Sequence, residues 1–206
     1  MEKNRVGGKA MKALFIKDLI YIKKEMLPLL LVLIVLPFIK SEFIVFTLVG
    51  GAVWSYGLIS ADLQSKWNVM EYMFPITPKE IVIEKYIIGY IAIFLTSLFA
   101  LLTQSLWSYT DLLVTNVQLL VTAISASLFL VAMILPVVFK CSTVTSGLIV
   151  CVLFGSVIGL ITGISDHLST PMLAITNNLP MVIGIIILLN VISILISILI
   201  VTNRKK

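Results

Sequence analysis

Long apolar runs without charged side chains restrict this chain to one kind of fold. Five runs of about 20 residues contain no Asp, Glu, Lys, Arg or His, at 43–61, 86–109, 119–139, 147–164 and 181–201. A helix needs about 20 such residues to cross the roughly 30 Å hydrocarbon core of a bilayer. Since 60% of all residues are hydrophobic and 12% are charged, a soluble core could not take up this much apolar surface. We therefore expect an all-α integral membrane protein.

A sixth run, 26–39, is shorter and contains Pro28 and Pro37. Lys and Arg collect in the short loops on the cytoplasmic side of a membrane. If all six runs span, every Lys and Arg except Lys40 lies on one side, whereas omitting the first run puts the N-terminal charges on the wrong side. We expect six transmembrane helices with both chain ends in the cytoplasm, in a multi-pass protein of a bacterial inner membrane. The predicted divisions are a cytoplasmic N-terminal segment (1–25), a six-helix transmembrane domain (26–201) and a basic tail (202–206).

The segment before the first run has the pattern of an amphipathic helix at a membrane surface. Apolar residues recur at helical spacing at Met11, Leu14, Phe15, Leu19, Ile22 and Met26. Lysines occupy the other positions, where they would face anionic headgroups or a cytoplasmic subunit. The alternative is an extended cytoplasmic start to the first span, and a bend near Pro28 would merge the two interpretations. The net charge of +5 is therefore read as a topology signal, with no nucleic-acid partner expected.

The predicted cytoplasmic loop 62–85, between the second and third spans, contains a short helix with one apolar face. Leu63, Trp67, Met70 and Phe74 follow one another at helical spacing, and Pro75 ends the helix. The pattern suits docking into a cytoplasmic partner and transmission of force to the two adjoining spans. The alternative is a helix that merely lies in the membrane interface, anchored by its aromatic residues.

A second helix start follows within the same loop. Thr77 is placed to be an N-cap, Pro78 is a first-turn proline, and Glu80 is the acidic residue of a capping box. The sequence thus predicts a helix that begins here and runs directly into the third span.

These features resemble the membrane permease subunits of type-2 ATP-binding-cassette exporters. The resemblance rests on the acidic start of the loop, its aromatic short helix, the Pro-Ile-Thr-Pro turn and the Glu-Ile-Val lead-in to the third span. It implies a coupling helix at 62–74 that seats against a cytoplasmic ATPase subunit, and a second permease subunit as homodimer or heterodimer partner. The implied contact residues are Asp62, Lys66, Trp67, Met70, Glu71, Tyr72 and Phe74.

The chain lacks groups that would supply energy or catalysis. Ion-coupled carriers usually hold ionisable residues at depth, and the apolar runs contain none. A Walker A loop is missing, because Gly7, Gly8 and Lys9 lack the upstream glycine and the hydroxyl residue. We expect no catalytic residue and no metal site here, with ATP and Mg²⁺ bound by the partner ATPase.

One helix face in run 147–164 carries small residues at every fourth position, at Gly147, Cys151, Gly155, Gly159 and Gly163. Such a face allows helices to approach closely, within the subunit or across a dimer, and the alternative is that it lines a substrate path. Gln104 and Asn190 are the strongly polar residues in the runs, and we expect them to form interhelical hydrogen bonds.

The expected function is export of a hydrophobic or amphipathic substrate, such as a peptide, a lipid-linked molecule or a drug, using ATP hydrolysed by a separate subunit. Peptide toxins come first among these on family habit alone. A non-transporting membrane scaffold or sensor that binds a cytoplasmic partner would share the topology and the loop. Replacing Trp67 should separate the two, because a transporter would lose transport and a scaffold would lose only assembly.

Overall fold

The computed structural model describes residues 13–39, 44–65, 67, 76–107, 113–141, 143–167 and 179–204, and almost all of these are helical. Residues 13–21 are α-helical and continue without a break into a π-helical stretch and then α2. The elements that follow residue 21 are η1 (Ile22–Met26), α2 (Leu27–Ile39), α3 (Ile44–Gln64), α5 (Pro78–Trp107), α6 (Leu113–Lys140), α7 (Thr143–His167) and α9 (Leu179–Arg204).

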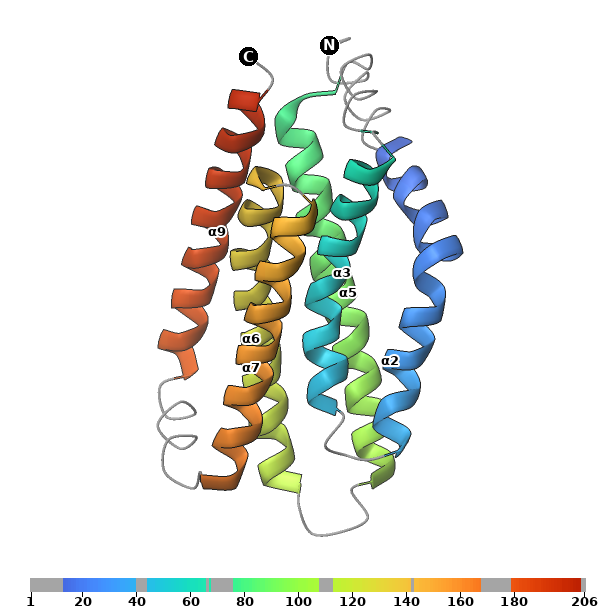
Figure 1. Ribbon diagram of the computed structural model, residues 1–206. Helices are drawn as coiled ribbons and strands as arrows, with labels where there is room; N and C mark the ends of the chain where they lie inside the picture. Colours follow the sequence, from blue (N-terminus) through green and yellow to red (C-terminus); the bar gives the residue numbers. More distant parts are fainter. Residues whose placement is uncertain are drawn as a thin grey trace, which may run out of the picture.

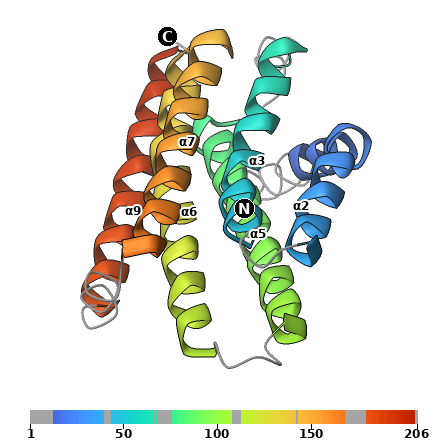
Figure 2. The ribbon, with the colours of Figure 1, turned by 60° about the horizontal axis from the view of Figure 1, so that its bottom comes forward.

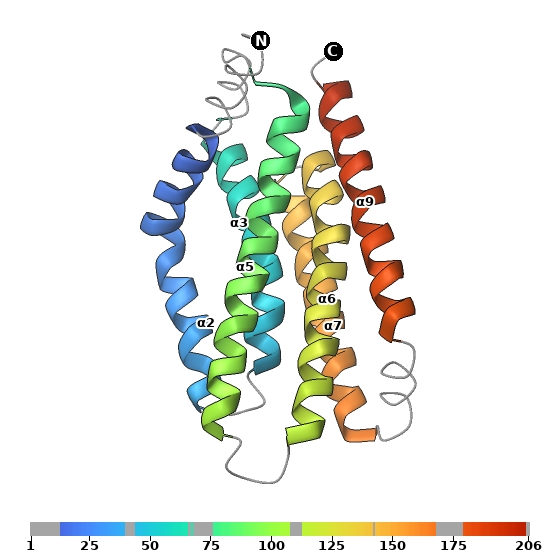
Figure 3. The ribbon, with the colours of Figure 1, turned by 180° about the vertical axis from the view of Figure 1, so that it is seen from behind.

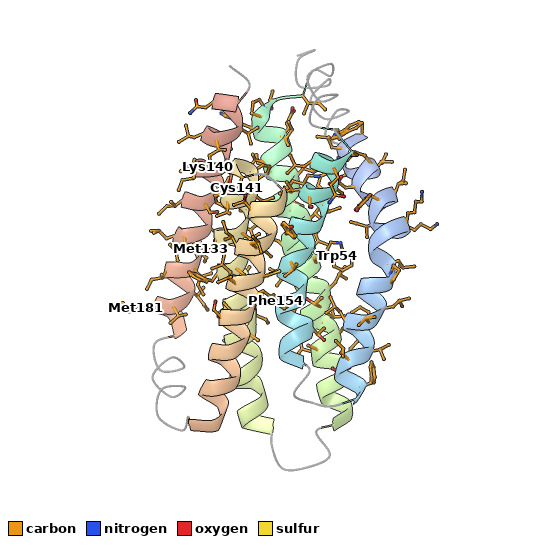
Figure 4. The ribbon with its side chains drawn as sticks, viewed as in Figure 1. Trp54, Met133, Lys140, Cys141, Phe154 and Met181 are labelled. Carbon is orange, nitrogen blue, oxygen red and sulfur yellow. The ribbon has the colours of Figure 1, made fainter. Side chains whose placement is uncertain are left out.

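Consecutive long helices run in opposite directions and form one elongated bundle (Figures 1 and 3). The described chain begins at residue 13 and finishes at Arg204 at the same end of the bundle, which we name the terminal end. Because α3 finishes and α5 begins at this end, the described residues at both ends of the 62–85 loop lie there (Figure 1). Lys140 and Cys141, between α6 and α7, also lie toward it (Figure 4).

The core forms where α3, α5 and α6 meet, and α9 packs on α6 and α5. In the view of Figure 2, α2, α3 and α5 lie on one side and α6, α7 and α9 on the other. Val82 and Tyr86 of α5 are buried with Leu130 and Ile134 of α6. By contrast, α9 turns large apolar side chains outward along most of its length, as a helix does when its surroundings are lipid.

Three helices are long and apolar enough to cross a membrane within the described residues: Pro78–Thr103, Ala123–Lys140 and Met181–Asn203. They correspond to the third, fourth and sixth predicted spans. The other predicted spans fall on η1 and α2, on α3 and on α7, which are helical but do not meet this criterion over the described residues. Six spans and their orientation therefore stay a prediction.

The helix at 13–21 divides its apolar residues differently from the predicted pattern. Leu14 is buried against the bundle, but Leu19 points outward with Ile16 and Ile20. Asp18 takes an inward position instead and is almost fully buried. Phe15 and Ile22 of the predicted face pack inward against α3 and α5, so Leu19 is the described member of that face that departs from the pattern. A position of this helix at a membrane surface stays a prediction.

Candidate functional site

Five charged side chains meet at the terminal end, where the helix at 13–21, the end of α3 and the start of α5 come together. We name Lys17, Asp18, Asp62, Glu84 and Lys85 the charge cluster. The Lys85 ammonium lies 2.5 Å from Asp18 Oδ2 and 2.7 Å from Asp62 Oδ2. The Lys17 ammonium lies 2.6 Å from Asp62 Oδ1 and 3.0 Å from Asp18 Oδ1. Four of the five groups therefore form a closed ring in which each carboxylate uses one oxygen for each lysine.

The ring is largely removed from solvent. The side chains of Lys85 and Asp18 are each 2% exposed, and those of Asp62 and Lys17 are 16% and 23% exposed. Charges taken out of water are tolerated only when their partners are well placed, and removing one partner of a buried pair costs about 3–5 kcal/mol. The ring meets this condition, so it holds three helical segments in one arrangement.

The ring also sets the ionisation of Asp18. Burial by itself raises the pKa of this carboxyl, but the neighbouring ammonium groups, Lys85 foremost, outweigh burial and hold the pKa below its usual value. A depressed pKa means that the stability contributed by Asp18 is present at neutral pH and is lost as the pH falls through the folded-state pKa.

Glu84 is the third carboxyl beside only two ammonium groups. Its side chain is 0% exposed, and its nearest cation among the described residues is the Lys85 ammonium, 3.7 Å from Oε2. Neither carboxyl oxygen has a hydrogen-bond partner within the described part of the chain. That absence holds for two ionised carboxylates, whereas a proton on Glu84 would allow a hydrogen bond to the neighbouring Asp18 carboxylate. Glu84 is therefore the one carboxyl of the cluster without a cation at hydrogen-bond distance among the described residues.

The loop joins the cluster at both of its ends. At the first end, the Lys17 ammonium lies 4.9 Å from the ring centroid of Trp67, a cation–π contact. At the second end, the backbone N–H of Thr77 donates to Glu80 Oε2 (2.8 Å), and the N–H of Glu80 donates to Thr77 Oγ1 (3.3 Å). The predicted capping box is confirmed, and it fixes the first turn of α5, two turns before Lys85.

The predicted contact residues of the loop are only partly placed. Asp62 belongs to the ring, and Trp67 lies against Lys17. Five others lie outside the described residues: Lys66, Met70, Glu71, Tyr72 and Phe74. Their proposed contacts with a partner stay a prediction.

The small-residue face of α7 is occupied at one end and open further along. A Cβ added at Gly147 would lie 2.9 Å from the Tyr56 hydroxyl of α3, so this glycine allows a close approach inside the subunit. A Cβ at Gly155 or Gly159 would meet nothing within 4 Å. The surroundings of Gly163 lie outside the described residues. Packing inside the subunit therefore accounts for Gly147, whereas Gly155 and Gly159 are exposed among the described residues.

Polar side chains connect α5, α6 and α9 deeper in the bundle. The Tyr86 hydroxyl shares a hydrogen bond with Ser193 Oγ (2.5 Å), and Ser193 Oγ donates to the Ala132 carbonyl (2.5 Å). The Tyr90 hydroxyl donates to Asn190 Oδ1 (2.9 Å). The interhelical role predicted for Asn190 is confirmed, whereas the side chain of Gln104 lies outside the described residues.

Sequence reasoning did not identify the charge cluster as a unit. Lys85 and its partner Asp18 are 67 positions apart, and Glu84 and Lys85 come immediately before the predicted third span rather than inside it. One signal was available: Ile81, Lys85 and Ile88 share a helix face, and both isoleucines are buried. A charge in the middle of an inward-facing stripe indicates a partner on a neighbouring helix.

One comparison with known proteins covers most of the chain. A family model described as ABC-2 family transporter protein matches residues 13–202. No curated protein matches the chain, and no solved structure matches it. The matched range includes every member of the charge cluster and all of the bundle except the last two residues of α9.

Proposed function

This chain belongs to the ABC-2 family of transporter proteins, and on that premise we propose that it moves a hydrophobic or amphipathic molecule outward across a membrane, driven by ATP that a separate subunit hydrolyses. Membership makes the chain a multi-pass membrane component and the non-catalytic part of a transporter. It also implies an ATPase partner in general terms. The substrate, the attachment site and the direction of transport belong to the proposal.

The attachment site for the ATPase is the 62–74 segment of the loop. The observation that carries this assignment is that the charge cluster ties both ends of the loop to the bundle. Asp62 is the first residue of the segment and is held by Lys17 and by Lys85, the last residue of the loop. Trp67, within the segment, lies against Lys17. A displacement of the segment would therefore be transmitted to α3, to α5 and to the helix at 13–21 together.

A second permease subunit completes the transport path. Cys151, Gly155 and Gly159 form an exposed strip of small residues along α7. A helix from another subunit could approach this strip closely, because small residues let backbones come together.

The apolar recesses around α9 support the proposed substrate class. A cavity of about 270 Å³ lies between α6 and α9, with Met133, Pro136 and Leu189 in its wall. A second cavity of about 330 Å³ contains Tyr90 and Asn190 among otherwise apolar residues. Such surfaces suit an apolar molecule or one with a single polar group, and nothing in them favours a peptide over a lipid-linked molecule or a drug.

The terminal end faces the cytoplasm in this proposal, which gives both chain ends the predicted orientation in a bacterial inner membrane. Lys17, Lys79, Lys85, Lys140 and Arg204 belong to parts of the helices near this end. A cytoplasmic ATPase with bound ATP and Mg²⁺ would meet the loop there.

The test is purification of the tagged complex from its native membranes, with co-purified ATPase and ATP hydrolysis as the readouts. We expect Trp67→Ala to release the ATPase or to remove its activity in the complex, and Trp67→Phe to retain most of both, because an aromatic face remains for Lys17. The matched control is Lys79→Ala, an exposed lysine of the same loop outside the cluster.

Two results would contradict the proposal. An ATPase that stays bound and fully active in Trp67→Ala would remove the loop from the coupling role. Release of the partner with no ATP-dependent movement of any hydrophobic substrate by the wild-type complex would favour a scaffold instead.

A further inference from the structure

The outward face of the first helix combines apolar side chains with two lysines. Leu19 and Ile20 are 67% and 62% exposed, and Leu27 and Leu31 are 45% and 54% exposed. Lys23 and Lys24 lie between these pairs along the helix and are both exposed. Lysines among exposed apolar side chains are typical of a helix surface in the interfacial region of a bilayer, where the stems contact apolar surface and the ammonium groups reach the headgroups.

Lys23 and Lys24 differ from the other lysine of this helix. Lys17 points inward and has two carboxylates within 3.0 Å. Lys23 and Lys24 form no ion pair with any of the described residues. They lie in the π-helical stretch, and π-helical turns within α-helices occur frequently at functional sites.

The direction of the helix decides what these lysines can reach. Side chains of a helix lean toward its N-terminus, which here is the terminal end. The two ammonium groups therefore extend away from the apolar residues of α2 and toward the headgroup level, while the stems cover apolar surface. Below them, Leu27 and Leu31 present an exposed surface suited to acyl chains.

We propose that Lys23 and Lys24 form a binding site for the headgroup of an anionic phospholipid, whose acyl chains lie along the outward face of α2. A zwitterionic headgroup brings its own cation and leaves the two ammonium charges uncompensated, so the site selects an anionic lipid. The apolar residues on both sides of the pair fit a lipid and do not fit the polar rim of a soluble subunit. This site does not depend on the proposed transport function.

The test measures lipid binding to the full-length protein after purification and removal of bound lipid in detergent. Phosphatidylglycerol and phosphatidylcholine with identical acyl chains are titrated separately, and bound lipid is counted by native mass spectrometry. We expect the wild-type protein to bind phosphatidylglycerol at least about tenfold more tightly, since each lysine near an anionic surface contributes about fivefold. Lys23→Gln with Lys24→Gln should abolish the preference, and Lys23→Arg with Lys24→Arg should retain it.

The controls separate this site from general electrostatic attraction. Lys79→Gln removes an exposed lysine at the same end of the molecule and should leave the preference unchanged. Soluble glycerol phosphate should not compete with the lipid. Equal binding of both lipids by the wild type, an undiminished preference in the double Gln variant, or full competition by glycerol phosphate would each overturn the proposal. Loss of the ATPase from the double Gln variant with its lipid preference intact would also overturn it, since the lysines would then bind a protein.

Discussion

Lys85 and Glu84 are neighbours in the chain and are both buried, yet their electrostatic situations are opposite. Lys85 has carboxylates at 2.5 Å and 2.7 Å. Both oxygens of Glu84 lack a hydrogen-bond partner within the described residues. A buried polar group that is not hydrogen-bonded costs about 1–3 kcal/mol, and more when it is charged. Substitutions of Lys85 and Glu84 can therefore separate the stability that the ring contributes from the effect of burying a charged side chain.

We expect Lys85→Gln to lower the free energy of unfolding by about 3–5 kcal/mol, because Asp18 and Asp62 lose a shared cation in a buried place. Glu84→Gln should leave stability unchanged or raise it, because it removes a buried carboxyl that has no close cation, and the Gln amide can still donate a hydrogen bond to Asp18. The measurement is the thermal midpoint of the detergent-solubilised protein, which is monitored as the loss of monodisperse protein on heating.

Asp18→Asn removes the other partner of the Asp18–Lys85 pair. Like Lys85→Gln, it should lower the free energy of unfolding. Combining Asp18→Asn with Lys85→Gln should cost less than the sum of the single changes, since the two groups are partners. Equal effects of Lys85→Gln and Glu84→Gln would show that burial alone, and not the ring, determines stability here.

At the scale of whole helices, two glycines allow α3 and α5 to pack closely against each other. A Cβ at Gly51 of α3 would lie 2.5 Å from Thr96 Oγ1, and a Cβ at Gly89 of α5 would lie 2.2 Å from Ser55 Oγ. Neither distance is possible without movement. The crossing of α3 and α5 is therefore fixed by residues that have no side chain, and it positions the helix ends that hold Asp62 and Lys85.

We expect Gly89→Ala to destabilise the protein by about 1–3 kcal/mol, the usual cost of overpacking. The opposing atom is a single hydroxyl oxygen, and the Cβ of Ser55 would be 3.5 Å away, an ordinary contact. Ser55→Ala should therefore restore most of the stability lost in Gly89→Ala. The readout is again the thermal midpoint in detergent.

Gly184→Ala is the control for the intrinsic helix preference of alanine, because a Cβ at Gly184 of α9 meets nothing within 4 Å. It should be neutral or slightly stabilising. If Ser55→Ala does not restore the stability lost in Gly89→Ala, then the close approach of Ser55 is not what requires glycine at position 89.

At the scale of the whole molecule, the described part of α7 has an exposed strip of small residues, and a second copy of the chain is one partner that could cover it. Cys151 is exposed, and Gly155 and Gly159 continue the strip. If two copies meet there, their Cys151 side chains come near each other. Two cysteines can be bridged only when their Cα atoms are within about 7 Å.

We expect oxidation in native membranes to join two copies through Cys151 in a Cys141→Ser background, detected as a dimer on a non-reducing gel. Gly155→Leu with Gly159→Leu should abolish the cross-link, because large side chains would hold the two α7 helices apart. Gly184→Leu, an equally open glycine on α9, should not. A Cys151 cross-link that persists in the Gly155→Leu, Gly159→Leu variant would show that the contact between the two copies does not depend on these glycines.

The sequence alone determined the features that depend on local pattern. Apolar runs of sufficient length predicted the helices, and three of them meet the criterion for a membrane span in the structure. Thr77, Pro78 and Glu80 predicted the start of α5, because a capping box involves groups only three residues apart. The combination of loop, topology and apolar runs indicated the transporter family that the comparison shows.

The tertiary structure alone decided which distant residues meet and which face of each helix is inward. Spacing indicated an apolar face for the helix at 13–21, but the rotation of that helix against α3 and α5 brings Asp18 inward and turns Leu19 outward. Likewise, the glycines of α7 repeat at one spacing but have two environments. Gly147 faces Tyr56, whereas a Cβ at Gly155 would meet no described atom within 4 Å. Helical periodicity places residues on a common face, whereas side-chain packing between helices decides what that face contacts. The charge cluster arises in this way, because its partners lie up to 67 positions apart and only the packed bundle brings them together.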